Sequence, residues 1–197
     1  MAQRLGKDTF DQLFLTARSQ NKWLAKDVPD ATLREIVDLM NMGPTSANCE
    51  PARIVFVKSA ESKQRLAPHL SEGNRAKTLE APVCAIIGYD LHFYEHLPRL
   101  FPHNQTARSW FEGKGEVATM TAVRNGTLQG AYFMLASRAL GLDVGPMSGF
   151  DNAGVDREFF PDGRVKSNFL CSVGYGDATG LFARSPRFAF DEMAKIL

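Results

Sequence analysis

The chain is organised around one polar loop, Gly43-Pro44-Thr45-Ser46-Ala47-Asn48-Cys49-Glu50-Pro51-Ala52-Arg53, which joins a helical pattern to the apolar run Ile54-Val55-Phe56-Val57. The two prolines fix their own φ angles and bias the residues before them toward extended backbone, so the loop is stiff without regular hydrogen bonding. Thr45, Ser46 and Asn48 offer groups that both donate and accept hydrogen bonds. The loop therefore suits a flat heterocyclic ligand. The alternative is a proline-rich connector whose Ser and Asn satisfy their own backbone.

The composition is that of one globular domain. The chain has 197 residues, of which 44% are apolar and 23% are charged, and this length is enough to bury a core. A net charge of +1 argues against nucleic acid as the main partner. The sequence has no apolar run long enough to span a membrane, and its N-terminal residues lack the apolar core of a signal peptide. We therefore expect one domain, 1–197, in a cytoplasmic protein that binds neither nucleic acid nor a membrane.

Cysteine and histidine spacing indicates neither a disulfide scaffold nor a metal site. Cys49, Cys84 and Cys171 are widely spaced and include no Cys-x-x-Cys pair, which disfavours disulfides and structural zinc. His92 and His96 stand four residues apart, but no third ligand accompanies them. We expect no metal ion. A chemical role for Cys49, which lies in the candidate loop, and for the histidine pair is left open.

Apolar periodicity predicts helices and strands that alternate without a strict βαβ rhythm. Helical spacing marks the segment 8–20, with Asp8 as its N-cap, and a segment that opens at Pro29-Asp30 and closes at Gly43 as a C-cap. Further helices are expected at 60–70, 116–140 and 151–160, strands at 53–58, 82–89, 142–146 and 167–175, and a polar link at 71–77. This order predicts an α/β (α+β) fold, a three-layer α-β-α sandwich.

Three segments stand out from this pattern. Segment 90–112 is rich in aromatic residues and prolines, has no clean period, and is expected to be a lid or excursion. The helix at 116–140 is apolar over so much of its surface that we expect it to be buried, in a core or against a second subunit. The tail at about 180–197 holds Arg184 and Arg187 and is expected to be a C-terminal arm.

Polar clusters fall at the ends of these elements. Arg18-Ser19-Gln20-Asn21 follows the first helix, and its guanidinium, hydroxyl and amide groups could hold a phosphate and a ring edge; a solvated helix end is the alternative. Asn74 and Lys77 could share a helical face. In Ser148-Gly149, the glycine leaves main-chain N–H groups open to a ligand face. Arg108 is placed to hold an anionic substrate, although a surface cation beside an aromatic ring is the commoner explanation.

Three motifs together resemble the FMN-dependent nitroreductase superfamily over nearly the whole chain. They are Gly43-Pro44-Thr45-Ser46-Ala47-Asn48-Cys49 with Pro51-Ala52-Arg53, Gly145-Pro146-Met147-Ser148-Gly149-Phe150-Asp151, and Gly174-Tyr175-Gly176-Asp177. In this combination they look like the malonic semialdehyde reductase branch, which serves bacterial uracil degradation, a pyrimidine catabolism. The chain departs at Glu50 and Ala52, where many members have Gln and Trp, and at Ser148, where nitroreductases often carry Glu. These departures alter bulk and charge near the flavin and weaken the expectation of a nitroaromatic preference.

The resemblance implies an intertwined homodimer with two FMN sites at the subunit interface, each lined by both chains. The N-terminal segment would hold the FMN phosphate and pyrimidine, the proline-bounded loop would come from the second chain, and the arm would supply phosphate contacts. The residues matched to cofactor binding are Arg18, Ser19, Asn21, Pro44, Thr45, Ser46, Asn48, Asn74, Lys77, Ser148, Gly149, Arg184 and Arg187. Gly149 matches the position whose N–H faces flavin N5, and the helix at 116–140 matches the dimer-core helix.

The resemblance also implies a reductase that takes NADH or NADPH as reductant and works by a two-step hydride relay through FMN. The expected substrate is a small aldehyde, malonic semialdehyde, which gives 3-hydroxypropanoate. We expect Gly149 to act in catalysis through the flavin and Arg108 to act by holding a substrate carboxylate. Two alternatives stay open: a broad nitroaromatic or quinone reductase, and a non-catalytic flavin-binding or scaffold protein.

Overall fold

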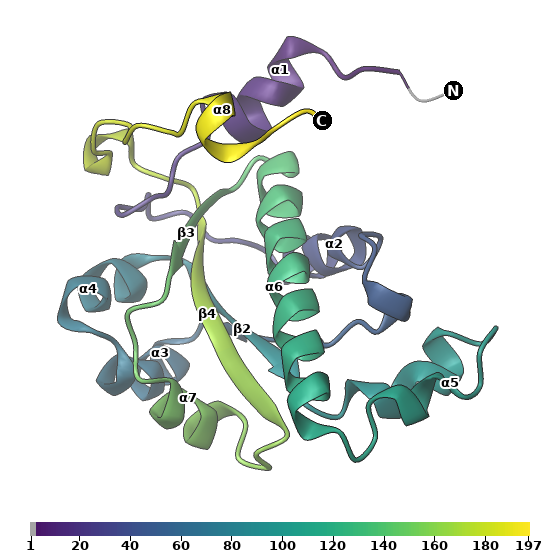
Figure 1. Cartoon of the computed structure of the whole chain (residues 1–197). Coiled ribbons are helices and arrows are strands. Elements are labelled where there is room, and N and C mark those ends of the chain that lie inside the picture. Colours follow the sequence, from purple (N-terminus) through teal and green to yellow (C-terminus); the bar gives the residue numbers. More distant parts are fainter. Residues whose placement is uncertain (1–2) are drawn as a thin grey trace.

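The structure is a computed structural model that describes residues 3–197. Its centre is a four-stranded antiparallel sheet in the order β1-β2-β4-β3 (Figure 1). The strands are β1 (Ala52–Val57), β2 (Val83–Asp90), β3 (Asp143–Met147) and β4 (Val165–Gly174). Each pair of neighbouring strands is antiparallel, so the sheet and its helices form an α+β fold, as expected.

Helices cover both faces of this sheet. They are α1 (Lys7–Phe10), α2 (Asp30–Met40), α3 (Ala60–Leu66), α4 (Glu72–Glu80), α5 (Leu97–Leu100), α6 (Gly115–Ala139), α7 (Asn152–Phe159) and α8 (Phe190–Met193). Side chains alternate along β2: Val83, Ala85 and Ile87 join the core with α2 and α6, whereas Cys84 and Ile86 join the core with α3 and α7. The three-layer α-β-α arrangement is therefore confirmed. No helix within residues 3–197 combines the length and the apolar character that a membrane crossing requires.

The first helix is shorter than the segment 8–20 that the apolar spacing predicts. α1 continues as one π-helical turn and then ends. Gly6, not Asp8, stands at the N-cap, and no side chain caps it. The chain then extends beside β3, where Gln20 N donates to Val144 O at 3.0 Å. Pairing with the sheet edge thus overrides the helical spacing of this segment.

The segment 71–77, expected to be a polar link, belongs to the helix α4 instead. The buried side chain of this helix is Thr78, so α4 lacks the apolar periodicity that would have identified it. Asn74 and Lys77 lie three residues apart within it, which is the spacing of neighbours on one helical face.

Gly43 does not act as the C-cap that the sequence predicts. α2 ends at Met40, and Gly43 is not among the residues with positive φ, the conformation that a glycine C-cap uses. A Cβ atom at this position would lie 2.2 Å from Cδ2 of Tyr132. Glycine is therefore required here because the chain approaches α6 closely.

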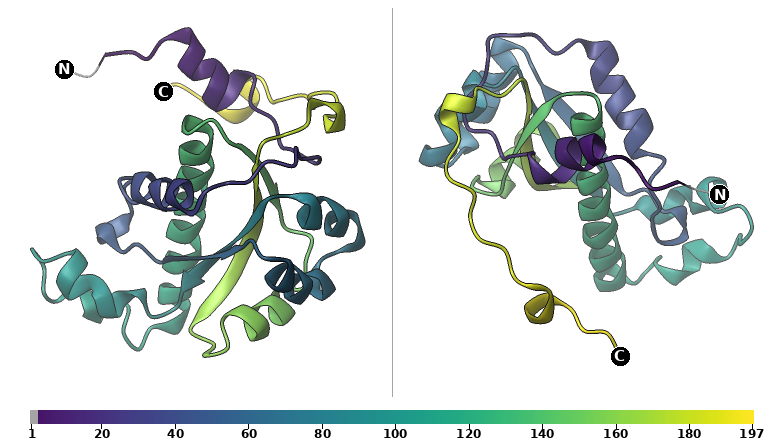
Figure 2. Two further views of the ribbon diagram at one scale, coloured as in Figure 1. Left: turned by 180° about the vertical axis from the view of Figure 1, so that it is seen from behind. Right: turned by 90° about the horizontal axis from the view of Figure 1, so that it is seen from above.

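The excursion at 90–112 is a folded unit that packs on the proline-bounded loop. It consists of short helical turns that include α5 (Figure 1). Phe93 and Leu97 share a small core with Cys49 of the loop and Ala118 of α6. The C-terminal arm, in contrast, runs away from the body and carries α8 near its end (Figure 2, right). Apolar side chains of the arm are exposed, namely Phe182, Phe188, Phe190, Met193 and Ile196.

Candidate functional site

Several predicted cofactor residues line one open cavity of about 690 Å³. The cavity lies between the extended N-terminal segment, the end of α6 and the start of the arm. The predicted residues in its wall are Arg18, Ser19, Asn21, Arg184 and Arg187. The other lining residues are Phe14, Leu15, Ala17, Arg138, Phe182, Ala183 and Ser185. Both ends of the chain therefore contribute to one wall, as the sequence resemblance implies.

This arginine cavity is strongly cationic, because the described residues in its wall include four arginines and no acidic residue. The guanidinium groups donate to main-chain carbonyl oxygens: Arg18 to Phe182, Arg138 to Leu13 at 2.9 Å, Arg184 to Leu15 and Ala17 at 2.8 and 3.0 Å, and Arg187 to Ser185 and Pro186 at 3.0 Å. Within residues 3–197, none of these four side chains forms an ion pair with a carboxylate. Uncompensated guanidinium groups of this kind fit a phosphate, which they bind in a two-pronged geometry.

Arg138 is the arginine of the cavity that the sequence did not indicate. It lies in the last turn of α6, and partial burial lowers the pKa of its guanidinium, with a further lowering from the charge of Arg184. An anion in the cavity would offset both unfavourable effects. The available signal was a cation in the last turn of the long helix.

A series of polar contacts links the arginine cavity to the turn after β3. Lys77 Nζ donates to Asn21 Oδ1 at 3.1 Å, which ties α4 to the N-terminal segment. Nearly one turn earlier on α4, Asn74 Nδ2 donates to Gly149 O at 2.9 Å. Three distant stretches of sequence therefore meet beside the cavity.

Gly149 leaves one main-chain donor without a partner in the part of the chain that the structure describes. Its N–H donates no hydrogen bond within residues 3–197, and a Cβ atom at this position would lie 2.6 Å from Asn74 Nδ2. Only glycine fits without displacing that amide. The free N–H, the ammonium of Lys77 and the exposed hydroxyl of Ser148 add donors for a ring edge to the phosphate contacts of the arginine cavity. The donor set therefore fits the expected FMN.

The proline-bounded loop lies apart from the arginine cavity in the single chain. Pro44, Thr45 and Ser46 line a second hollow, of about 590 Å³, together with residues of α6. Asn48 turns toward the excursion, where its Nδ2 donates to Leu100 O at 2.9 Å. One chain therefore presents the predicted cofactor residues as two separate groups.

Arg108 belongs to neither group. It lies in the excursion and pairs with Glu112, whose carboxylate raises the pKa of the guanidinium. Exposed pairs of this kind contribute little stability, so a substrate carboxylate could replace Glu112 at low cost. The role of Arg108 in holding a substrate stays a prediction.

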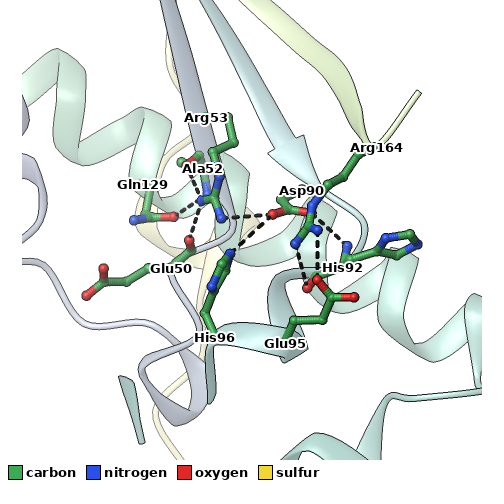
Figure 3. Close-up of polar contacts among 9 residues, drawn as sticks. All are labelled: Glu50, Ala52, Arg53, Asp90, His92, Glu95, His96, Gln129 and Arg164. Atoms are coloured by element: carbon green, nitrogen blue, oxygen red, sulfur yellow. Dashed lines mark hydrogen bonds and ion pairs between the residues drawn. The ribbon is translucent and has the colours of Figure 1, made fainter. Parts of the chain in front are cut away.

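Neither Cys49 nor the histidine pair has the features of a reactive centre. Burial raises the pKa of the Cys49 thiol to about 11, so its thiolate is scarce at neutral pH. His96 Nε2 lies 3.9 Å from the buried carboxylate of Asp90, which also binds Arg53 and Arg164 (Figure 3). In the part of the chain that the structure describes, no three His, Cys, Asp or Glu side chains gather as metal ligands would.

Known proteins share both the sequence and the fold. A model of the nitroreductase family matches residues 15–175. A protein of Burkholderia lata, provisionally named NADH dehydrogenase/NAD(P)H nitroreductase, is 60% identical over 192 residues and covers 98% of both chains. HadB of Ralstonia pickettii, with the same provisional name, is 59% identical over 182 residues, which are 91% of this chain and 93% of that one.

Solved structures with lower identity share the fold. A provisionally named nitroreductase of Exiguobacterium sibiricum, solved in complex with FMN, has a TM-score of 0.87 at 17% identity and covers 100% of both chains. A provisionally named NAD(P)H:FMN oxidoreductase of Staphylococcus epidermidis has a TM-score of 0.84 at 20% identity, covering 100% of this chain and 98% of that one.

Proposed function

Because the chain belongs to the nitroreductase family, we propose that it is an FMN-dependent oxidoreductase that takes electrons from NADH or NADPH. Membership follows from the family match and from the identity to its relatives. It confirms the expected family, the expected fold and the expected class of enzyme. The observation that carries the proposal is the arginine cavity, where the described lining residues include four arginines and no carboxylate. Its Asn21 is bound by Lys77 of α4, the helix whose Asn74 binds Gly149.

The residues of the chain have distinct tasks in this proposal. Bound FMN would supply hydride transfer between a nicotinamide and an acceptor, which no side chain can perform. Arg18, Arg184 and Arg187 would hold the phosphate, and Arg138 would add charge from α6. Lys77, oriented by Asn21, would place a positive charge beside the ring edge.

We further propose that the working unit is a homodimer, because a second copy could join the two groups that one chain keeps apart. α6 exposes the apolar side chains Val117, Met120, Val123 and Leu128, of which Leu128 lines the hollow beside the loop. Exposed apolar side chains gathered on one helix mark an interaction surface. In this dimer, the proline-bounded loop of one chain would complete the arginine cavity of the other.

For the substrate, we propose malonic semialdehyde, reduced to 3-hydroxypropanoate. The support is the resemblance of the three motifs and the small Ala52 in the loop. Arg108 would hold the substrate carboxylate, and an unchanged KM for malonic semialdehyde in Arg108→Ala would remove that role. A second candidate, a nitroaromatic compound or quinone as acceptor, is favoured by the names of the relatives and by exposed Trp110 in the excursion.

Anaerobic reduction of the purified protein separates these candidates. We expect NADH or NADPH to bleach the yellow colour of the bound flavin, and malonic semialdehyde to restore it faster than a nitrofuran or a quinone does. Faster recovery with the nitrofuran or quinone would favour the second candidate. A yellow protein that neither nicotinamide bleaches would be a non-catalytic flavin-binding protein, and a protein that binds no FMN would contradict the whole proposal.

A further inference from the structure

The proline-bounded loop has an unusual backbone. Ala47, Asn48 and Glu50 have φ values of 50°, 48° and 37°, in the left-handed region that residues with a Cβ atom rarely adopt. Asn tolerates this region better than most residues, but Ala and Glu do not. Such a conformation persists only where the surrounding structure imposes it, and it is typical of functional sites.

Three side chains of α6 form hydrogen bonds with the main chain of this loop. Asn125 Oδ1 accepts from Ser46 N at 2.9 Å, Gln129 Oε1 accepts from Ala52 N at 2.8 Å, and Tyr132 Oη donates to Pro44 O at 3.0 Å. Their spacing of four and three residues places them on one face of the helix; Figure 3 shows the contact of Gln129 with Ala52. The helix therefore holds the loop near its start, its middle and its end.

A simpler explanation is that these buried polar groups only provide one another with hydrogen-bond partners. Asn125 and Gln129 are each only 1% exposed, and buried amides need partners. Two features indicate that these side chains also position the loop. The bonds of α6 go to main-chain atoms on both sides of the residues with positive φ, and the Ser46 hydroxyl is exposed and forms no hydrogen bond within the described residues 3–197. The backbone is fixed while the side chain stays free for a ligand.

We propose that Asn125, Gln129 and Tyr132 are positioning residues that preset the loop in its FMN-binding shape. The inference rests on the proposed function, because it needs the loop to contact the cofactor. The entropy of ordering the loop is lost during folding, when the hydrogen bonds to α6 form. FMN binding therefore does not have to order the loop, and FMN binds more tightly. The three side chains touch the loop and act through it.

The test compares FMN binding by matched variants of the full chain. Gln129→Met removes the acceptor but keeps the length of the side chain, so we expect the Kd for FMN, from fluorescence titration of the apo-protein, to rise about tenfold. Ser137→Ala, a buried change on the same helix that does not touch the loop, should leave the Kd unchanged.

Two further variants keep the test decisive where Gln129→Met folds poorly. Tyr132→Phe removes only the hydroxyl that binds Pro44, and we expect the Kd to rise about threefold. Adding Ala47→Gly to Gln129→Met should recover part of the affinity, because glycine adopts positive φ without a steric cost. General loss of packing would not be reversed by that glycine.

The outcomes separate this inference from the proposed function. If the unaltered protein binds no FMN, the proposed function fails. If it binds FMN, but Gln129→Met and Tyr132→Phe bind it with an unchanged Kd, only the positioning role is overturned. A loss in Gln129→Met that Ala47→Gly does not reduce would also overturn it, because the backbone conformation of the loop would then be irrelevant.

Discussion

Replacing Arg18 by Gln will raise the Kd for FMN by about 10- to 100-fold, because a hydrogen bond to a charged group contributes about 1.5–3 kcal/mol. Riboflavin carries no phosphate, so its Kd should change by less than about twofold in the same variant. The measurement is fluorescence titration of the apo-protein with each flavin. The difference between the two flavins isolates the phosphate contact from any change in ring binding.

Two further variants test the same phosphate contact. Arg187→Gln should behave like Arg18→Gln. Its interpretation is simpler, because within residues 3–197 Arg187 donates only to the carbonyls of its neighbours Ser185 and Pro186. Arg157→Gln removes a cation from the exposed surface of α7 and should leave both affinities unchanged. Equal losses of FMN and riboflavin in Arg18→Gln would show that the arginine cavity does not bind the phosphate.

Replacing Leu128 by Glu will dissociate the proposed dimer, with a rise of about 100-fold or more in the dimer dissociation constant. The expected cost is about 3 kcal/mol, because the new carboxylate would be buried without a partner in the interface. The side chain of Leu128 is 39% exposed in the single chain and lines the hollow beside the loop. Sedimentation velocity at micromolar protein should show monomers, and the same sample should have lost most of its FMN.

Leu79→Glu is the matched control for this variant. Leu79 lies on α4 and is 37% exposed, so the same change at nearly the same exposure should leave the dimer intact. A Leu128→Glu protein that remains dimeric would show that this face of α6 is not the interface. A monomer that retains FMN with unchanged affinity would contradict a site built from two chains.

The regular elements were predictable where local pattern and tertiary packing agree. The long helix predicted at 116–140 is α6, Gly115–Ala139, and the four strands lie within a few residues of their predicted positions. The predictions for 8–20, where the helix is shorter than expected, and for 71–77, which is not a link, failed for opposite reasons. The first segment has helical spacing, but its end pairs with β3 instead of continuing the helix. The second segment is a helix with too few apolar residues to show a helical period.

The candidate site was predictable only in part. The resemblance of three motifs indicated Arg18, Arg184 and Arg187, and the structure gathers them in one cavity. Arg138 was missed because its role depends on where the last turn of α6 lies relative to both ends of the chain. Gln129 was missed because an amide within a long helix carries no signal of what it binds.

In the proposed dimer, one FMN site needs the arginine cavity of one chain and the proline-bounded loop of the other. The direct test uses two defective variants, Arg18→Gln/Arg187→Gln in the cavity and Ser46→Glu in the loop, co-expressed with different tags and purified as mixed dimers. Neither variant alone should bind FMN, whereas the mixed dimer should bind about one FMN with normal affinity, because it contains one undamaged site. If each site came from a single chain, every site in the mixed dimer would be defective, and absence of bound FMN would contradict the account.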